Sequence, residues 1–507
     1  MTQQPRLLHD LLSEQARSEP DRPALHFDGS TLSYAQLHKL VVVLAECIAA
    51  TGEPGDRIGV LAWNHPEYVA MLYAVPRAGR VLVPLNSRLA PAELAAQIQR
   101  AGIGLLFADG DLLRRLETGA SLPDALRCIR FGTDFLGALP PTASTIMPEV
   151  LPEATAWLLY TSGTTGQPKG AMLSHRSILA GLVSAASGRP VDSQDVYLYP
   201  FPLFHVSAHN VLLQHKHGAA VLLVASFDAD EVLTCCREQG VTTMSLAPTM
   251  VRMLIDNPGF KWSDLAAIRT IGYGASAMPS ALLQRLCQGC TVGLSGGYGM
   301  TELSGSVAFL DVAGHRRAVS EAPGLLASVG KLVPGVEARL VTSDGEEVSS
   351  GGKGEILIRG AQLMLGYWGD APGTAAVIVD GWLHTGDIGR FDAEGNLYIV
   401  DRLKDMVLSG GENVASREVE EVLLAHPGVS DVAVVGLPDA QWGEAVCALV
   451  VLKLTSQHPE DELIGHCRGL LAGYKTPKFI RFSSSLPVNA SGKIDKPAVR
   501  EYLASTR

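Results

Sequence analysis

Apolar residues recur in two patterns along the N-terminal part of the chain, and these patterns predict alternating helices and strands. A helix is expected from Tyr34, where Ser33 precedes it as a hydroxyl N-cap. The apolar runs within residues 55–61 and 81–85 are short enough for buried strands, and a helical segment from Asn64 separates them. Strand, helix and strand in this order are typical of an α/β fold with a mostly parallel sheet.

The pattern changes in the C-terminal half of the chain. Between residues 330 and 400 it consists of short strand-like runs with hairpin chemistry at Asp344-Gly345, which predicts a β-rich lobe. A charge run begins at Asp401, and the segment after it alternates helix and strand patterns as a small α+β unit. We therefore predict a large N-terminal domain over residues 1–400, with two α/β sheets and the β-rich lobe, and a small domain over residues 401–507.

Composition narrows the class of protein. The chain has 507 residues, which is long for one domain, and 47% hydrophobic with 18% charged residues describe a globular protein. Its net charge of −11 argues against general binding to nucleic acid or to anionic membranes. The first residues lack the basic start and long apolar stretch of a signal peptide, and no run approaches the roughly 18 apolar residues of a membrane span. We expect a soluble, cytoplasmic protein.

The stretch Tyr160–Gly170 (YTSGTTGQPKG) combines hydroxyl side chains, glycines and one lysine between two strand-like runs. Glycines let backbone N–H groups turn toward a polyphosphate, the hydroxyls add donors, and Lys169 adds a point charge. A Walker A loop would place its lysine after a glycine at the start of a helix, whereas Pro168 precedes Lys169 here. The stretch predicts a phosphate-binding loop outside the P-loop class, with a flexible linker as the alternative.

Further segments carry candidate chemistry. His205 and His209 lie in the apolar segment PLFHVSAH, where a histidine is also a common core residue. Small residues at 272–277 follow a predicted strand and suit a ligand that lies close to the backbone. Segment 296–303 (GGYGMTEL) joins an aromatic ring, a hydroxyl and a carboxylate, which suits adenine stacking and magnesium coordination. Asp387 follows a Thr-Gly turn, where its carboxylate can accept bonds from ribose hydroxyls or cap the turn.

Two further features of the sequence concern a lysine and a cysteine pair. Lys493 follows Gly492 on a predicted turn in the segment LPVNASGKI, although an exposed lysine is usually only a solvated charge. Cys287 and Cys290 form a C-x-x-C pair, but the chain has no second pair at a ligand spacing. No structural metal is therefore expected.

Together, five motifs resemble those of the adenylate-forming superfamily, which joins acyl-CoA synthetases, peptide-synthetase adenylation domains and firefly luciferase. The motifs are YTSGTTGQPKG, YGMTE, GWLHTGD, DRLKDMVLSGGENV and LPVNASGKI. The similarity extends over essentially the whole chain, beginning with SEPDRPAL near the start. It implies a free-standing acyl-CoA synthetase that forms an acyl-adenylate from ATP and a carboxylic acid, and then passes the acyl group to coenzyme A.

The resemblance also implies the residues of the ATP site. Magnesium is expected on Glu302 and Thr161, while Lys493 and His205 are expected at the reacting atoms, with Glu302 and Thr301 beside them. The residues expected around ATP or AMP are Thr161, Ser162, Gly163, Thr164, Thr165, Gly166, Lys169, Gly274, Ala275, Ser276, Tyr298, Gly299, Met300, Thr301, Asp387, Arg402 and Lys493.

In this family the small C-terminal domain rotates between the two half-reactions, and the matching hinge residue here is Asp401. The face that carries Gly410 and Gly411 is then expected to line a tunnel for the pantetheine arm of coenzyme A, since only glycine leaves room beside the backbone. Further candidates for contact with coenzyme A are Trp442, Tyr474 and Lys475.

The acid pocket implied by the resemblance is largely apolar and lined by small residues. Its expected members are His205, Val206, Ser207, His209, Thr249, Gly272 and Gly297. Peptide-synthetase domains resemble one another in an aspartate near this histidine segment, and PLFHVSAH has none, so a hydrophobic aliphatic, aryl or polycyclic acid is expected. A dicarboxylic acid would need a cation in the pocket, and Arg252 is near in sequence.

Two other functions remain open on the sequence, and neither changes the fold expected. One is an acyl-AMP ligase that loads a carrier protein, although the insertion shared by dedicated acyl-AMP ligases is not seen. The other is a non-catalytic adenylate-binding relative, against which the presence of Lys493, Glu302 and Lys169 argues. The expected partners are small molecules, with a homodimer also compatible with the sequence.

Overall fold

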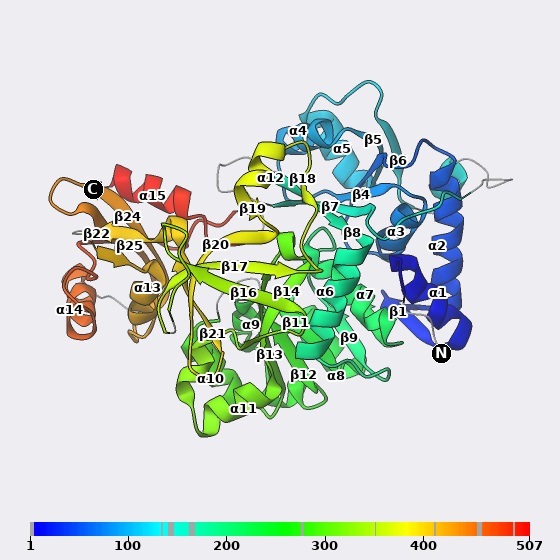
Figure 1. The fold of residues 1–507 in the computed structure, drawn as a ribbon. Coiled ribbons are helices and arrows are strands. Elements are labelled where there is room, and N and C mark those ends of the chain that lie inside the picture. Colours follow the sequence, from blue (N-terminus) through cyan, green and yellow to red (C-terminus); the bar gives the residue numbers. More distant parts are fainter. Residues whose placement is uncertain are drawn as a thin grey trace.

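The computed structural model describes residues 5–132, 135–139, 147–161, 168–274, 278–349, 351–409, 412–453, 459–489 and 492–506. Figure 1 shows a large body, coloured from blue to yellow, and a smaller lobe in orange and red at its side. This division agrees with the predicted architecture of a large α/β N-terminal part and a small C-terminal unit. None of the helices in the described ranges is long and apolar enough to cross a membrane.

A seven-stranded sheet forms the upper right part of the body (Figure 1). Its strands, in order across the sheet, are β18 (Gly366–Tyr367), β8 (Lys169–Ser174), β7 (Thr155–Thr161), β4 (Val81–Pro84), β3 (Arg57–Leu61), β5 (Ile103–Ala108) and β6 (Arg127–Arg130). Strands β3 to β7 run parallel, and β7 and β8 form an antiparallel hairpin. The connecting helices are α3 (Pro66–Arg77), α4 (Pro91–Ala101) and α5 (Gly110–Gly119). The strands are almost continuously apolar because helices cover the sheet.

A nine-stranded sheet forms the lower part of the body. Its strands, in order, are β15 (Lys331–Leu332), β14 (Gly305–Leu310), β13 (Gly293–Met300), β12 (Thr270–Tyr273), β11 (Thr243–Leu246), β9 (Val196–Tyr199), β10 (Ala220–Leu223), β1 (Pro23–Phe27) and β2 (Ser30–Ser33). Strands β13, β12, β11, β9, β10 and β1 are parallel, so their carboxyl ends meet at one edge. That edge is where ligands bind in open α/β sheets.

The helices that accompany this sheet are α1 (Leu8–Ser18), α2 (Tyr34–Ala49), α6 (His175–Gly188), α7 (His209–Lys216), α8 (Ala229–Glu238), α9 (Pro248–Ile255), α10 (Ser280–Gly289) and α11 (Val312–Ser320). The predicted start of α2 is confirmed, since the Ser33 hydroxyl accepts a hydrogen bond from the backbone N–H of Gln36 at 3.3 Å.

The predicted β-rich lobe is an antiparallel sheet of β16 (Val336–Val341), β17 (Gly354–Gly360), β20 (Trp382–Phe391), β19 (Ile378–Val379) and β21 (Leu397–Arg402). One short helix, α12 (Ala371–Val377), interrupts it. The strand pattern gave no sign of this helix, which is fixed at its start by the Asp370 carboxylate accepting a bond from the backbone of Gly373.

The small C-terminal lobe is a mixed sheet flanked by three helices. Its strands are β22 (Val407–Ser409), β23 (Glu412–Val414), β24 (Val429–Asp439), β25 (Gly443–Leu452) and β26 (Phe479–Phe482), and its helices are α13 (Ser416–Leu424), α14 (Glu460–Leu470) and α15 (Lys496–Ser505). Strand β21 of the large body continues through Asp401 to Arg402, so the chain enters the small lobe directly from a paired strand. The domain boundary at residue 401 stays a prediction.

Candidate active site

The hairpin of β7 and β8 presents the two ends of the predicted phosphate loop. Thr161 and Lys169 are paired across this hairpin, each at the end of its strand. The intervening loop positions Ser162, Gly163, Thr164, Thr165 and Gly166 lie outside the described residues. The Lys169 ammonium lies 3.5 Å from an oxygen of Asp370 and 4.9 Å from the centre of the Tyr367 ring. These contacts hold the lysine at the mouth of the loop.

Glu302 lies beside this hairpin, at the end of β13. Its Oε1 atom is 3.4 Å from the Thr161 hydroxyl and accepts a hydrogen bond from the Tyr367 hydroxyl at 3.0 Å. Burial and the neighbouring Glu302 carboxylate raise the pKa of Tyr367, so it stays a donor. One carboxylate and one hydroxyl at the end of β7 suit Mg²⁺, which also takes phosphate oxygens and water. The residue types therefore fit the predicted metal role of Glu302 and Thr161.

Asp387 forms the centre of a second cluster, on β20. The residue is 4% exposed, and its carboxylate accepts a hydrogen bond from the Tyr298 hydroxyl at 2.7 Å and lies 3.3 Å from Nε of Arg402. Tyr298 comes from β13, whereas Arg402 lies opposite Asp387 on β21. Burial raises the pKa of Asp387, and Arg402 and Tyr298 oppose that rise. The structure thus brings together three residues predicted around ribose and adenine.

The predicted adenine side lies along the ends of β12 and β13. A Cβ atom on Gly274 would meet the backbone oxygen of Gly297 at 3.0 Å, so the two strands leave no room for a side chain there. Ala275 and Ser276 lie outside the described residues. The remaining predicted residues continue from Tyr298 into the turn before β14, namely Gly299, Met300 and Thr301.

Lys493 comes from the small lobe and faces the large one. Its pKa is lowered by burial and by Arg402, while the carboxylates of Glu302 and Asp387 oppose that effect. The residue is nevertheless exposed to solvent. Its loop is fixed by Asn489, whose backbone N–H donates to the Lys493 carbonyl at 2.8 Å and whose Oδ1 accepts from the Lys493 N–H at 3.1 Å.

His205 directly precedes the short 3-10 turn Val206–Ala208 and lies near Lys493. Burial, with the nearby charges of Lys493 and Arg88, lowers the pKa of His205 to about 4. The imidazole is therefore neutral at physiological pH. Arg88 is exposed and comes close to the turn of the small lobe, since one of its Nη atoms lies 3.8 Å from where a Cβ atom of Gly492 would be. The sequence analysis did not single out Arg88.

The predicted acyl residues are distributed over the start of α7, the start of α9 and the strands β12 and β13. His209 is buried, its Nδ1 atom is 2.7 Å from the Val206 carbonyl oxygen, and burial lowers its pKa to about 4. Ser207 contacts the Tyr199 hydroxyl at 3.2 Å, and Thr249 is exposed. Gly272 and Gly297 lie on adjacent parallel strands.

Arg252 is directed away from this group. Its Nη1 atom donates to the Ser430 carbonyl at 3.2 Å and lies 3.5 Å from Asp431 in the small lobe. A different cation, Arg189, is packed against Gly272. The sequence gave no signal for Arg189, because it follows α6 in an irregular segment far from every motif.

Two other residues of the site were missed by the sequence analysis. Tyr367 and Asp370 come from β18 and the start of α12, and they hold Glu302 and Lys169 respectively. The Gly-Tyr pair of β18 lies outside the five motifs of the sequence. The pairing of β18 with β8, through Gly366 and Met172, is what delivers Tyr367 to the phosphate loop.

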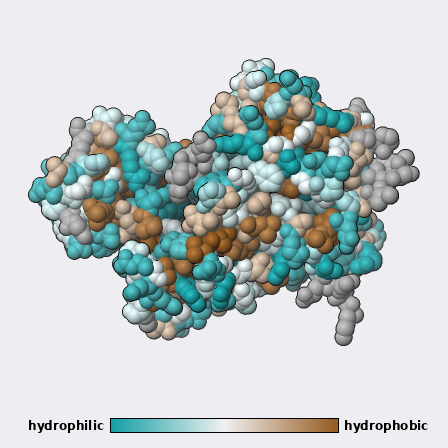
Figure 2. All heavy atoms as spheres, turned by 45° about the horizontal axis from the view of Figure 1, so that its top comes forward, coloured by the Kyte–Doolittle hydropathy of each residue, from teal (hydrophilic) through white to brown (hydrophobic). Residues whose placement is uncertain are grey.

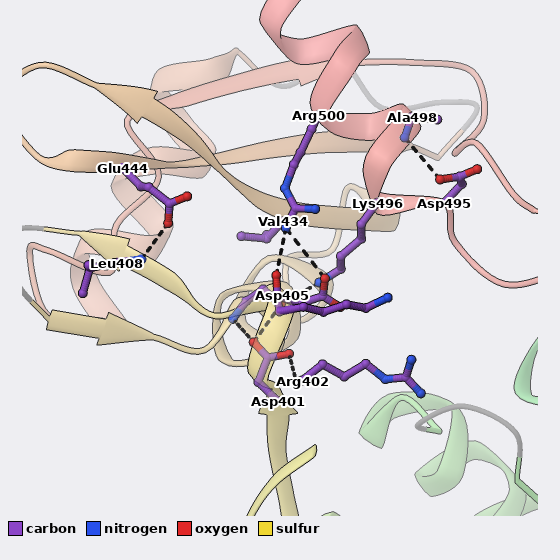
Figure 3. A network of polar contacts seen from close by, with 12 residues as sticks. Asp401, Arg402, Asp405, Leu408, Val434, Glu444, Asp495, Lys496, Ala498 and Arg500 are labelled. Atoms are coloured by element: carbon purple, nitrogen blue, oxygen red, sulfur yellow. Dashed lines mark hydrogen bonds and ion pairs between the residues drawn. The ribbon is translucent and has the colours of Figure 1, made fainter. Parts of the chain in front are cut away.

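The predicted hinge is anchored in the small lobe. Asp401 accepts hydrogen bonds from the backbone N–H and the hydroxyl of Ser416, and the hydroxyl also accepts from Nζ of Lys496 at 2.6 Å. Lys496 is 3.0 Å from Glu420, and Arg500 from the same helix lies 3.7 Å from Asp405 (Figure 3). Asp401 is thus the point at which the strand of the large body is tied to α13 and α15.

The predicted contacts for coenzyme A lie on the small lobe. Gly410 and Gly411 lie outside the described residues. Ser409, which precedes them, pairs with Gly443, next to Trp442. Trp442 lies under the ammonium of Lys478 at 4.6 Å from the ring centre.

Tyr474 and Lys475 are placed on another part of the small lobe. The Lys475 ammonium is held by the Glu418 carboxylate at 2.7 Å, so it is engaged within the lobe. Tyr474 packs beside it, with the ammonium 5.9 Å from the ring centre. The roles of both residues, like that of Trp442, stay predictions.

The comparisons with known proteins agree with this geometry. Residues 12–368 match the model of the AMP-binding enzyme family, and residues 418–493 match that of the AMP-binding enzyme C-terminal domain. The chain therefore belongs to the AMP-binding enzymes, the adenylate-forming superfamily, and within it is an AMP-forming acyl-CoA synthetase.

Similar proteins span the whole chain. A feruloyl-CoA synthase from Amycolatopsis sp is 38% identical, covering 96% of this chain and 97% of its own. A fatty acid–[acyl-carrier-protein] ligase from Streptomyces coeruleorubidus is 34% identical, covering 96% and 95%. The solved o-succinylbenzoate CoA synthetase from Bacillus subtilis, in complex with ATP and magnesium ion, is 31% identical with a TM-score of 0.84, covering 97% of this chain and 99% of its own.

Proposed function

We propose that this synthetase activates a hydrophobic carboxylic acid as an acyl-adenylate, with ATP and Mg²⁺ as reactants and release of pyrophosphate, and then transfers the acyl group to coenzyme A. The observation that carries the proposal is the position of Lys493. The small lobe presents this lysine to Glu302, Asp387 and His205, which three different elements of the large body supply.

The arrangement supports the adenylation step as follows. The acid carboxylate attacks the α-phosphorus in line, so catalysis depends on positioning and on neutralising the charge that develops. The lowered pKa of Lys493 reflects burial and Arg402, and an anionic phosphate beside it would favour the charged ammonium. Lys493 would then hold the carboxylate and the α-phosphate together.

The other groups bind and orient. Mg²⁺, held by Glu302 and Thr161, would supply neutralisation of the phosphate charge. Asp387 would accept hydrogen bonds from both ribose hydroxyls, and Tyr298 and Arg402 keep its carboxylate in place. The neutral imidazole of His205 would add no second positive charge next to Lys493.

The acyl acceptor requires a test of its own, because one relative loads an acyl-carrier protein. Coenzyme A is favoured because the feruloyl-CoA synthase has the higher identity, 38% against 34%. The acid is proposed to be hydrophobic because the expected acyl residues are small or apolar, and because those relatives act on an aromatic acid and a fatty acid.

The test is a mass-spectrometric assay with ATP, Mg²⁺ and coenzyme A over aliphatic, aryl and polycyclic acids, scoring acyl-adenylate, AMP and acyl-CoA separately. Acyl-CoA from one class of acid supports the proposal. Acyl-adenylate without thioester points to a carrier protein as acceptor, which a holo carrier protein added to the same reaction would test. No product from any acid contradicts the proposed function.

A further inference from the structure

Arg189 is a buried cation that has only neutral partners. The residue is 8% exposed and follows α6. Its Nη2 atom donates to Oδ1 of Asn210 at 2.6 Å, and Nη1 donates to the Ser245 hydroxyl. The guanidinium also lies 5.6 Å from the centre of the Tyr197 ring. Among the described residues, no carboxylate forms an ion pair with it.

This arrangement leaves donors without acceptors. A guanidinium has five N–H groups. The bonds to Asn210 and Ser245 use two of them, and the Tyr197 hydroxyl also lies within reach of the guanidinium. The Nε atom of Arg189 is buried and has no hydrogen-bond partner within the described ranges. A buried positive charge without an anion is costly, and buried donors are rarely left unsatisfied. The site therefore lacks a hydrogen-bond acceptor for the Arg189 guanidinium, and a ligand can supply one.

Arg189 lies next to Gly272, one of the residues expected around the acyl group. Ser245, Gly272 and Ser295 lie side by side on β11, β12 and β13, and Nη1 of Arg189 lies against the first two. A Cβ atom on Gly272 would overlap Nη1, so the glycine is what admits the arginine. Gly272 precedes Gly274, on the predicted adenine side, by two residues, which is about 7 Å along the strand.

The side chains on α7 complete this end of the site. His209, one residue before the Arg189 partner Asn210, is neutral at physiological pH because burial and Arg189 lower its pKa to about 4. Its contact with the Val206 carbonyl fixes the proton on Nδ1, since a carbonyl oxygen can only accept. The side chains of His209 and Asn210 are both neutral, so neither supplies a negative charge that could pair with Arg189.

We propose that Arg189 binds an oxygen acceptor at the far end of the acyl group, so the acids that this synthetase prefers carry a second carboxylate or a carbonyl oxygen there. This inference rests on the proposed acyl-adenylate chemistry. It assigns the recognition of a polar end group to Arg189 and excludes Arg252, which is engaged with the small lobe. The walls beside Arg189 can still be apolar, as Phe309 packs against Gly188 next to it.

The experiment compares acids that differ only at the far end. Two series suit the roughly 7 Å span estimated from the strand rise: 4-methyl-, 4-acetyl- and 4-carboxycinnamic acid, and heptanoic, 6-oxoheptanoic and heptanedioic acid. Acyl-adenylate formation is followed by pyrophosphate release, and kcat/KM is determined for each acid. We expect the acceptor-bearing acids to be preferred over their methyl analogues on the order of a hundredfold, because a buried hydrogen-bonding site rejects an analogue that leaves it unpaired.

The variants Arg189→Met and Arg252→Met separate the two arginines. Arg189→Met should remove the preference, or reverse it in favour of the methyl analogue, whereas Arg252→Met should leave the ratio between acids unchanged. The relative kcat/KM of the carboxylate and carbonyl acids distinguishes the two acceptor types. If Arg189→Met does not fold, the wild-type ranking and the variant Arg189→Lys provide the test.

A wild-type enzyme that uses the methyl acids as well as their partners would overturn the role of Arg189 and leave the proposed function intact. So would an unchanged preference in Arg189→Met. Failure to adenylate any acid, in these series or among the acids of the broader assay, would overturn both proposals.

Discussion

Two buried charges of opposite sign lie in the large body, and their surroundings differ. Asp387 has a hydrogen bond from Tyr298 and an ion pair with Arg402, so its negative charge is compensated within the protein. Arg189 has a hydroxyl, an amide oxygen and an aromatic ring, but no anion among the described residues. A carboxylate whose charge is already compensated can accept hydrogen bonds from neutral hydroxyl groups. A guanidinium whose charge is not compensated favours a ligand that carries a hydrogen-bond acceptor.

The difference separates residues expected to serve the reaction with any acid from the residue proposed to select the acid. The Asp387 cluster is built from β13, β20 and β21, and its residues belong to motifs that the sequence already displays. Arg189 is positioned by residues outside those motifs, on α7 and β11. The proposed nucleotide side of the site thus consists of motif residues, whereas the proposed acid side depends on packing around one arginine.

Lys493 is the residue proposed at the reacting atoms, near Glu302 and Asp387, so its removal should have the largest effect on activity. We expect Lys493→Ala to lower the rate of acyl-adenylate formation on the order of 10²- to 10³-fold, as for other groups that stabilise charge developing in a transition state. Single-turnover pyrophosphate release measures this step. The matched control is Lys453→Ala, because Lys453 is an exposed lysine of the small lobe whose ammonium donates to the Pro427 carbonyl. Near-normal adenylation in Lys493→Ala would contradict the assigned role.

The neutral histidines of α7 should make stability depend on pH. His209 and His215 both have a pKa lowered to about 4 by burial, against about 6.5 in the unfolded chain. The unfolded state therefore binds more protons between these values, and the free energy of unfolding falls as pH is lowered from 6.5 to 4. Each histidine accounts for at most about 3 kcal/mol.

Urea denaturation across this pH range measures the loss. His215→Gln should give a shallower dependence, because Tyr73 and the Ala24 carbonyl bond the His215 ring and can bond an amide in its place. An equal slope in that variant would show that His215 does not carry the effect.

Asp387→Asn, at the position proposed to bind ribose, should raise the KM for ATP about 10- to 100-fold, because hydrogen bonds from the ribose hydroxyls to a charged group are lost. Steady-state kinetics at saturating acid measure this change. Asp344→Asn, in an exposed turn, removes the same charge far from the site and should leave KM unaltered. If Asp387→Asn instead alters the preference among acids, the assignment of Asp387 to the nucleotide and of Arg189 to the acid is wrong.

The smallest effect is expected from the ion pair between Arg252 and Asp431. Both side chains are about one-third exposed, and such pairs contribute roughly 0–1 kcal/mol. Asp431→Asn should therefore slow adenylation by less than about fivefold, because the pair joins the lobes in the arrangement that presents Lys493. Rapid-quench measurement of both half-reactions tests this, and a larger effect on thioester formation than on adenylation would contradict it.

The sequence by itself determined the fold class and most of the nucleotide site. Residues such as Asp387, Tyr298 and Glu302 lie in short motifs whose local backbone already selects their chemistry. The structure places Tyr298 beside Asp387 and Thr161 beside Glu302, and their roles toward a nucleotide stay predictions. The fold class followed from the periodicity of apolar residues, because a strand buried on both faces must be apolar along its whole length.

Only the tertiary structure decided the remaining parts of the site. Tyr367 and Asp370 reach Glu302 and Lys169 because β18 pairs with β8, a contact between segments nearly two hundred positions apart. Arg252 is near the expected acid pocket in sequence, but the sequence could not place its side chain, and the structure shows it in contact with the small lobe. Which cation is buried beside Gly272 depends on which strands become neighbours, and local residue patterns carry no information about that pairing.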